Sequence, residues 1–203
     1  MNAAALAPQD VADAELAWWT ACNATFDAAV AAASKPDAGE TPLDKRELRN
    51  ALGRFATGVC VVTTRTPSGQ AAGLTVNSFS SVSLDPPLVA WCLGRHAPSL
   101  KAFAEAGHFA VHVMSADQHA LAMHFARPAA DKFAEVRDEF EPGIAQLPVL
   151  RHALARFECR KASTVDGGDH LIFIGRVERF AYVDQPPLLF HAGRFLERGP
   201  GAS

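Results

Sequence analysis

The 203-residue sequence lacks the motifs that mark several large enzyme classes. It contains no HExxH or CxxC motif and no cluster of cysteine and histidine, so we expect no metal site. It contains no GxSxG motif, which excludes the usual nucleophile elbow of the α/β-hydrolases. No GxGxxG motif opens a βαβ unit, so any nucleotide must bind to an architecture other than the Rossmann fold.

The sequence also has little net charge and no long apolar run. A formal net charge of -3 does not favour nucleic acid or an anionic membrane as a partner. No apolar run approaches the roughly 18 residues that span a bilayer. Asp10, Asp13 and Glu15 argue against a signal peptide. We therefore expect a protein that binds neither nucleic acid nor membrane.

Cysteine is scarce, and its spacing suggests no disulfide. The chain has four cysteines, far apart in the sequence, and Cys60, Cys92 and Cys159 each fall inside an expected strand. Buried, reduced thiols are the simplest interpretation of that pattern. Because reduced thiols are typical of the cytoplasm, we expect a cytoplasmic protein.

The composition that remains is that of a globular domain with an appendage. Hydrophobic residues make up 49% of the chain and charged residues 20%. Residues 1–42 read as an Ala-rich N-terminal helical extension and linker, with a helix expected over Ala14–Ala33. This helix could pack on the domain or on a dimer mate, or it could dock a partner enzyme. Residues 43–203 form the expected domain.

The patterns in this domain predict mainly β structure with short helices. Asp44 followed by Glu47 is a capping box, which opens a helix that we expect Gly58 to end. Residues 127–150 read as an irregular excursion. Strands joined by hairpins favour a closed antiparallel barrel over a parallel sheet. Strands are expected at 59–64, 72–77, 88–93, 109–114, 153–163, 170–181 and 188–190, and helices capped by Ser99 and Ser115 at 99–106 and 115–125.

A polar run between two of these strands is the strongest candidate for a binding site. Ala72–Pro87 starts as a strand, continues as a series of hydroxyl and amide side chains, and closes with Asp85-Pro86-Pro87. Such groups suit a flat, polar, anionic ligand, because they can meet the edge of a heterocycle and a phosphate together. A Ser-rich connecting loop is the alternative interpretation.

Four segments, taken in order, resemble one family. Gly73–Val89 resembles the flavin-contacting segment of the short-chain flavin reductase family, the reductase partners of two-component flavin-dependent monooxygenases. Leu52–Thr64 is similar to the opening helix and strand of that family. Gly168-Asp169-His170 and Pro187–Phe195 resemble its last two landmarks. The resemblance covers roughly residues 44–197.

The resemblance implies a split β-barrel of the FMN-binding type that forms a homodimer. It implies an NAD(P)H:flavin oxidoreductase that transfers hydride from NADH or NADPH to FAD or FMN and supplies reduced flavin to a partner monooxygenase. Two alternatives stay open: a flavoprotein of the same fold that retains its flavin and reduces another acceptor, and a non-catalytic flavin- or heme-binding split barrel. No catalytic side chain is expected, because hydride passes directly between the cofactors.

The resemblance also implies two sets of binding residues. Arg95 could instead be a solvated loop charge, and His170 a structural histidine at the start of a strand. The implied flavin set is Gly73, Leu74, Thr75, Asn77, Ser78, Leu93, Gly94, Arg95, Ser99, Leu100 and Arg127. The implied NAD(P)H set is His170, Gly193, Arg194 and Phe195.

Overall fold

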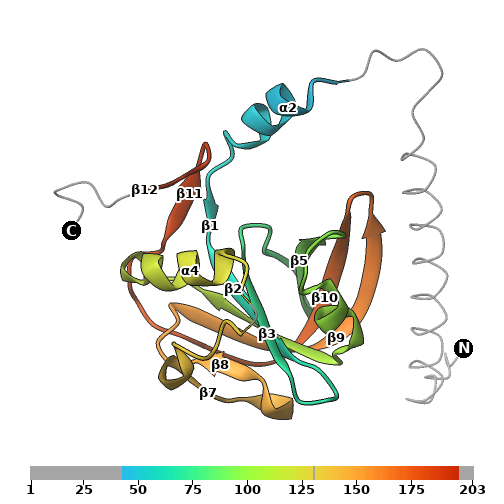
Figure 1. Ribbon diagram of the computed structural model, residues 1–203, viewed down its shortest axis with the longest axis vertical. Helices are drawn as coiled ribbons and strands as arrows, with labels where there is room; N and C mark the ends of the chain where they lie inside the picture. The colour runs from blue at the N-terminus through green and yellow to red at the C-terminus, as the bar shows by residue number, and fades with distance from the viewer. Residues whose placement is uncertain (1–42, 130, 197–203) are drawn as a thin grey trace, which may run out of the picture.

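The structure is a computed structural model, and it describes residues 43–129 and 131–196 (Figure 1). The helix expected over Ala14–Ala33 lies outside these residues. The described part is mainly β with a few short helices, as the patterns predicted. None of its helices has the length and hydrophobicity that crossing a bilayer would require.

A seven-stranded antiparallel sheet forms the body of the molecule, in the order β3-β2-β6-β9-β10-β5-β4. Within the described residues β3 and β4 remain edge strands, so hydrogen bonds do not close the expected barrel. The strands are β2 (Cys60–Arg65), β3 (Ala71–Val76), β4 (Ser80–Leu84), β5 (Pro87–Gly94), β6 (His108–Val113), β9 (Ala155–Gly167) and β10 (His170–Tyr182).

Two small sheets and the helices are arranged around this body (Figure 1). The three-stranded sheet consists of β1 (Thr57–Gly58), β11 (Leu189–His191) and β12 (Arg194–Leu196), and β7 (Phe140–Pro142) pairs with β8 (Pro148–Leu150). The α-helices are α2 (Lys45–Leu52), α3 (Leu100–Glu105) and α4 (His119–Ala126), and the 3-10 turns are η1 (Ala116–Gln118), η2 (Arg137–Glu139) and η3 (Ile144–Gln146).

An aromatic cluster fixes the centre of the large sheet. Trp91 on β5 and Phe173 on β10 are opposite each other in the register, and their rings stack with centroids 4.7 Å apart. Phe103 of α3 and Phe109 of β6 meet the Trp91 ring edge-on. All four side chains are buried. The cluster therefore joins α3 and three strands into one core.

The predicted strands are confirmed to within a few residues, but one helix boundary and one helix cap were wrong. Asp44 caps α2 by accepting from the Arg46 amide at 2.8 Å, yet the helix ends at Leu52 and not at Gly58. Thr57 and Gly58 are drawn into β1 because they pair with Leu189 and Phe190 of β11. Ser99 stands before α3, but its backbone is already helical and its side chain makes no capping bond.

Besides the short strands β1, β7 and β8, two further strands were missed by the sequence interpretation. Ser80–Leu84, which was interpreted only as part of a polar run between two strands, pairs with β5 as the edge strand β4. The second is β12, which returns from β11 through Ala192 and Gly193, at φ angles of 48° and 78°. Consecutive positive φ angles are those of a tight hairpin turn, which explains why the chain reverses there.

A buried histidine lies between the large sheet and β7. His112 is fully buried, and its Nδ1–H donates to the Val61 carbonyl at 2.9 Å. Its Nε2 has no hydrogen-bond partner among the described residues. Burial lowers the pKa of His112 to about 4, because the imidazolium would lose its hydration. The folded chain thus keeps this ring neutral at a pH where an exposed histidine is charged.

We predict that the free energy of unfolding decreases as the pH falls from about 6.5 to about 4. Between these values the unfolded chain binds a proton at His112 and the folded chain does not, so protonation favours unfolding. The shift from 6.5 to about 4 corresponds to a loss of about 3 kcal/mol. Urea unfolding at pH 7 and pH 4.5 measures it. The His112→Gln variant has no titrating imidazole at this position, so its free energy of unfolding should decrease much less over the same pH range. An equal decrease in both proteins would contradict the prediction.

Candidate functional site

A cleft of about 870 Å³ lies between β3, the N-terminal end of α3 and the segment that follows α4. Four of the expected flavin residues line it: Gly73, Leu74, Thr75 and Ser99. The volume lies within the range of small-molecule sites, which is roughly 300 to 1,000 Å³. The structure therefore brings the first part of the polar run together with the start of α3 in one cavity.

The close packing of α4 against β3 shapes the floor of this cleft. A Cβ atom at Gly73 would stand 2.8 Å from the Phe125 ring, so only glycine fits between β3 and this helix. Two residues along, Thr75 Oγ1 donates to the Ala122 carbonyl at 2.5 Å. The Thr75 oxygen can still accept a hydrogen bond from a ligand. These contacts hold the β3 backbone at a fixed depth along the cleft.

Two lysines at the edge of the cleft were not predicted from the sequence. Lys132 donates from Nζ to the Phe125 carbonyl at 2.7 Å, and its own carbonyl accepts from His124 Nε2 at 2.7 Å. Partial burial lowers the pKa of Lys132. Lys101 of α3 lines the same cleft. Glu105 also lines the cleft and pairs with Lys101 at 3.8 Å, so the positive charge that the cleft offers to an anionic ligand comes mainly from Lys132.

A local sequence signal could have indicated Lys132. Asp131 accepts from the Phe133 amide at 2.8 Å, the pattern of an Asx turn. The turn places Lys132 between Asp131, which accepts the hydrogen bond, and Phe133, whose ring packs against that of Phe125. The centroids of these two rings are 5.2 Å apart. An Asp-Lys-Phe sequence after a helix is thus a recognisable way to fix a cation.

The other expected flavin residues do not line the cleft. Ser78 accepts from the Cys92 amide at 2.9 Å and donates to the Cys92 carbonyl at 3.2 Å, so it joins the end of β3 to β5. Leu93 is a core side chain, 2% exposed. Asn77 and Arg127 are exposed. Gly94, Arg95 and Leu100 belong to the end of β5 and the start of α3, beside the cleft.

His170 lies beside the end of β5, on the neighbouring strand of the large sheet. It opens β10 and pairs with Gly94, the last residue of β5. Its Nδ1 donates to Asp169 Oδ1 at 2.7 Å, and this hydrogen bond is the main reason why the pKa of Asp169 lies below its usual range. The turn before it uses Gly168 at a φ of 78°. Half of the imidazole surface is exposed, so the ring remains accessible to a ligand.

Gly193, Arg194 and Phe195 occupy a different part of the chain. Gly193 supplies the turn between β11 and β12, and Arg194 is exposed. The Phe195 ring packs on His119 with centroids 4.5 Å apart. Figure 1 shows β11 and β12 at the upper left and the β9–β10 hairpin at the right. One copy of the chain therefore does not unite the expected dinucleotide residues.

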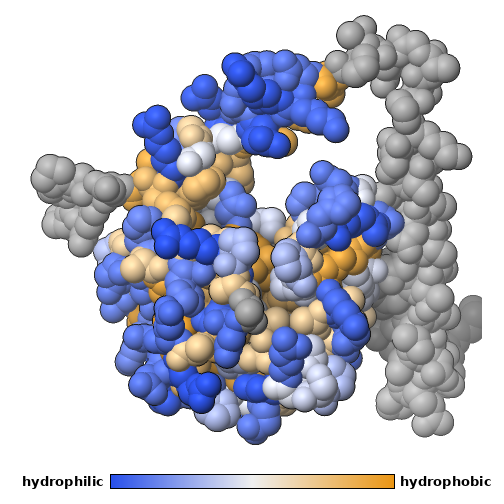
Figure 2. Space-filling model, viewed as in Figure 1, coloured by the Kyte–Doolittle hydropathy of each residue, from blue (hydrophilic) through white to orange (hydrophobic). Residues whose placement is uncertain are grey.

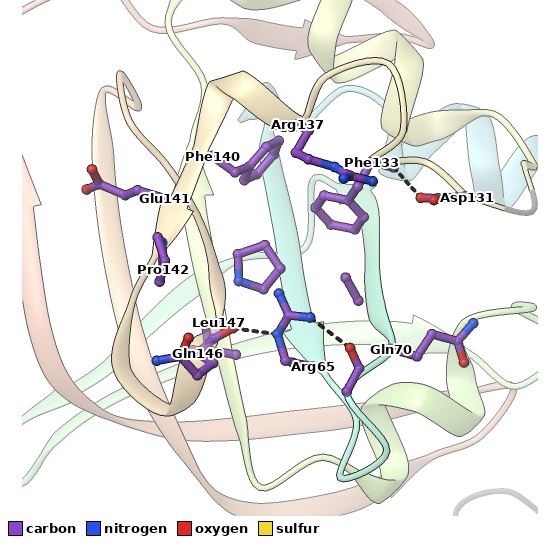
Figure 3. A pocket seen from close by; sticks show the side chains of 13 residues that line it. Arg65, Gln70, Asp131, Phe133, Arg137, Phe140, Glu141, Pro142, Gln146 and Leu147 are labelled. Carbon is purple, nitrogen blue, oxygen red and sulfur yellow. Dashed lines mark hydrogen bonds between the residues drawn. The ribbon is translucent and has the colours of Figure 1, made fainter.

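A second hollow of about 570 Å³ adjoins the cleft and shares Gln70, Ala71 and Phe133 with it (Figure 3). The side chain of Arg65, at the centre of this hollow, already forms hydrogen bonds with backbone carbonyls. Its Nε donates to the Gln146 carbonyl at 2.6 Å and its Nη1 to the Gly69 carbonyl at 2.7 Å. Arg65 thus links two turns of the protein, and these donors are not free for a ligand. The cleft beside β3 is therefore the better ligand site. The described residues contain no cluster of three or more potential metal ligands.

Comparison with known proteins gives one consistent family. The model of the flavin reductase like domain matches residues 52–198. FMN reductase (NADH) SmoA of Agrobacterium fabrum is 50% identical over 155 residues, which are 75% of this chain and 85% of that protein. The reductase component of the flavin-dependent trigonelline monooxygenase of Acinetobacter baylyi is 39% identical over 154 residues, 74% of this chain but 48% of that longer protein.

Solved structures agree with the sequence relatives. The Streptomyces globisporus C-1027 NADH:FAD oxidoreductase SgcE6, in complex with NAD and FAD fragments, superposes with a TM-score of 0.71 at 36% identity. The match covers 81% of this chain and 100% of that one. Since the family model spans most of the sequence and the fold agrees, the chain belongs to the family of flavin reductase like domains.

Proposed function

We propose that this chain is an NAD(P)H:flavin oxidoreductase, which transfers hydride from NADH or NADPH to FAD or FMN and supplies the reduced flavin to a partner monooxygenase. The observation that carries the proposal is the cleft beside β3, whose depth is set by the packing of Phe125 against Gly73 and which Lys132 and Lys101 line. A flat ring fits in a cleft of this volume, and a phosphate fits near a fixed ammonium group. We assign this activity to residues 43–203.

The side chains in this proposal bind and orient, and none needs to act as an acid or a base. Bound flavin supplies the acceptor ring, and NADH or NADPH supplies the hydride. Gly73 lets Phe125 of α4 pack closely against β3, and this packing sets the depth of the cleft that would hold the flavin. Ser99, Lys101 and Lys132 line the cleft and are the polar groups to which we assign the phosphate. Reaction then requires only that the two rings lie roughly 3 to 3.5 Å apart.

Exposed apolar residues support a homodimer as part of the proposal. Leu84 at the tip of β4 is 94% exposed, and Phe180 and Tyr182 on β10 are 65% and 76% exposed. In Figure 2 hydrophobic residues also gather over β11 and β12. Such surface is unfavourable in water and is typical of an interface. A second copy would also bring Arg194 and Phe195 toward the dinucleotide site of the first.

The curvature of the large sheet supports a split barrel. Parts of β3 and β5 lie within contact distance although they are not hydrogen-bonded neighbours, so the sheet curls as a split barrel of the FMN-binding type would.

A cytoplasmic location agrees with free thiols at Cys60, Cys92 and Cys159. Burial raises the pKa of Cys60 and Cys159 to about 12, which makes them unreactive.

The proposal predicts NADH oxidation that depends on added flavin. With the purified chain, the steady-state rate should saturate as free FMN or FAD is raised, because flavin is a substrate that leaves after reduction. Rates with each flavin and each of NADH and NADPH identify the preferred pair. A chain that retains its flavin through purification and oxidises no NADH when flavin is added would contradict the proposed function.

Lys132 gives a sharper test of where the phosphate binds. We predict that Lys132→Met weakens the binding of FMN about tenfold, the cost of one hydrogen bond to a charged group. The binding of riboflavin, which lacks the phosphate, should change little. Fluorescence titration of the two flavins measures both dissociation constants.

Lys161→Met is the matched control. Lys161 also donates to the last carbonyls of a helix, those of Phe103 and Ala104 of α3, and partial burial also lowers its pKa. It does not line the cleft. If both variants weaken FMN equally, or if Lys132→Met weakens riboflavin as much as FMN, the phosphate assignment is wrong.

A further inference from the structure

One side chain fastens the turn between β9 and β10 to the end of β5. Arg95 follows β5, and its Nε donates to the Gly168 carbonyl at 2.7 Å. Its Nη2 forms an ion pair with the Asp166 carboxylate. Its backbone amide donates to the Asp169 carbonyl at 2.9 Å. Three contacts from one residue thus converge on a single four-residue turn.

The Asp166 carboxylate completes this arrangement from the other side. One of its oxygens accepts from the Gly168 amide at 3.1 Å, and the other faces Arg95. The Arg95 hydrogen bond is the largest reason, and the Gly168 amide the second, why the pKa of Asp166 lies below its usual range. Both oxygens are therefore engaged, and the turn is held in one geometry.

The contribution of this pair to global stability is small. The Arg95 and Asp166 side chains are 39% and 55% exposed, and exposed ion pairs contribute little to the free energy of unfolding. What the contacts can set is the local conformation of the turn. A turn with an exposed backbone and a glycine at positive φ has many alternatives, so such local ties decide its position.

The position of the turn determines the position of His170, its next residue. His170 pairs with Gly94, and a Cβ atom at Gly94 would stand 3.7 Å from His170 Nε2. The imidazole therefore lies over a residue without a side chain. On the other side of Arg95, Ala97 and Ser99 line the cleft. Arg95 thus connects the wall of the flavin cleft to the turn that carries His170.

We propose that Arg95 is a positioning residue for the dinucleotide, which it serves by holding the 166–169 turn, and with it His170, over the end of β5. The proposal rests on the proposed function together with the contact between His170 and NADH or NADPH that the family resemblance implies. It differs from the role that the resemblance implies, in which Arg95 contacts the flavin phosphate. The guanidinium has two of its donors on the turn, and Arg95 does not line the cleft.

The test combines kinetics, binding and amide exchange. We expect Arg95→Ala to raise the KM for NADH and the dissociation constant of NAD+ about tenfold, with FMN affinity and thermal midpoint unchanged. Asp166→Asn should have a smaller effect in the same direction, because the Arg95 hydrogen bond to the Gly168 carbonyl remains. The double variant should be no worse than Arg95→Ala, because both substitutions act on the same turn. Arg95→Lys should recover only part of the loss, since an ammonium cannot reproduce the planar fork.

Hydrogen exchange of the Gly168 and His170 amides reports the turn directly. Exchange should accelerate in Arg95→Ala and Asp166→Asn. The matched control is Arg160→Ala, which removes another exposed ion pair of the same hairpin, with Glu178 at 3.2 Å, and contacts no part of the turn. That variant should leave both the exchange of these amides and NAD+ binding unchanged.

Three outcomes would overturn the proposal. FMN binding that weakens in Arg95→Ala while NAD+ binding stays normal would assign Arg95 to the flavin phosphate. Faster exchange with normal NAD+ binding would make the contacts structural only. Equal effects in Arg160→Ala would make them non-specific. Binding and exchange need no turnover, so a wild-type chain that fails to reduce flavin refutes the proposed function while these measurements still decide the role of Arg95.

Discussion

The pairing of β5 with β10 is the constraint on which the rest of the structure depends. Seven residue pairs, from Gly94–His170 to Leu88–Arg176, align the two strands, and the Trp91–Phe173 stack lies within that register. A slip of one strand by one residue would turn one of the two rings out of the core, so the register is strongly fixed. The same register places His170 beside Gly94, at the end of β5. Packing in the core thus decides which functional groups meet at the rim of the sheet.

The charge of the cleft depends on a second interaction, in which a backbone carbonyl at the end of a helix accepts a hydrogen bond from a lysine. Lys132 binds the Phe125 carbonyl of α4, where the helix dipole also favours positive charge. The ammonium is thereby fixed before any ligand arrives, and fixed charges bind anions better than mobile ones. A chain with a net charge of -3 can in this way present a local positive site without a broad basic surface.

Much of the strand pattern and the family could be predicted from the sequence, because apolar alternation and turn residues are local signals. β4 could not, since Ser80–Leu84 is polar and exposed and becomes a strand only by pairing with β5. Thr57 and Gly58 likewise become β1 only through β11. Gly73, Leu74, Thr75 and Ser99 lie together at one cavity, and the flavin contacts expected of them stay predictions. The contacts of Arg95 with the 166–169 turn were missed because they join segments far apart in the sequence, and the roles of the remaining site residues also stay predictions.

The account as a whole claims that hydride passes directly from NADH to a flavin that this chain orients without an acid or a base. Rapid anaerobic mixing of the chain with FMN and a limiting amount of NADH tests this claim most directly. The account predicts that the visible absorption band of the flavin bleaches, with one flavin reduced for each NADH consumed. No bleaching, or NADH consumption without reduced flavin, would contradict it.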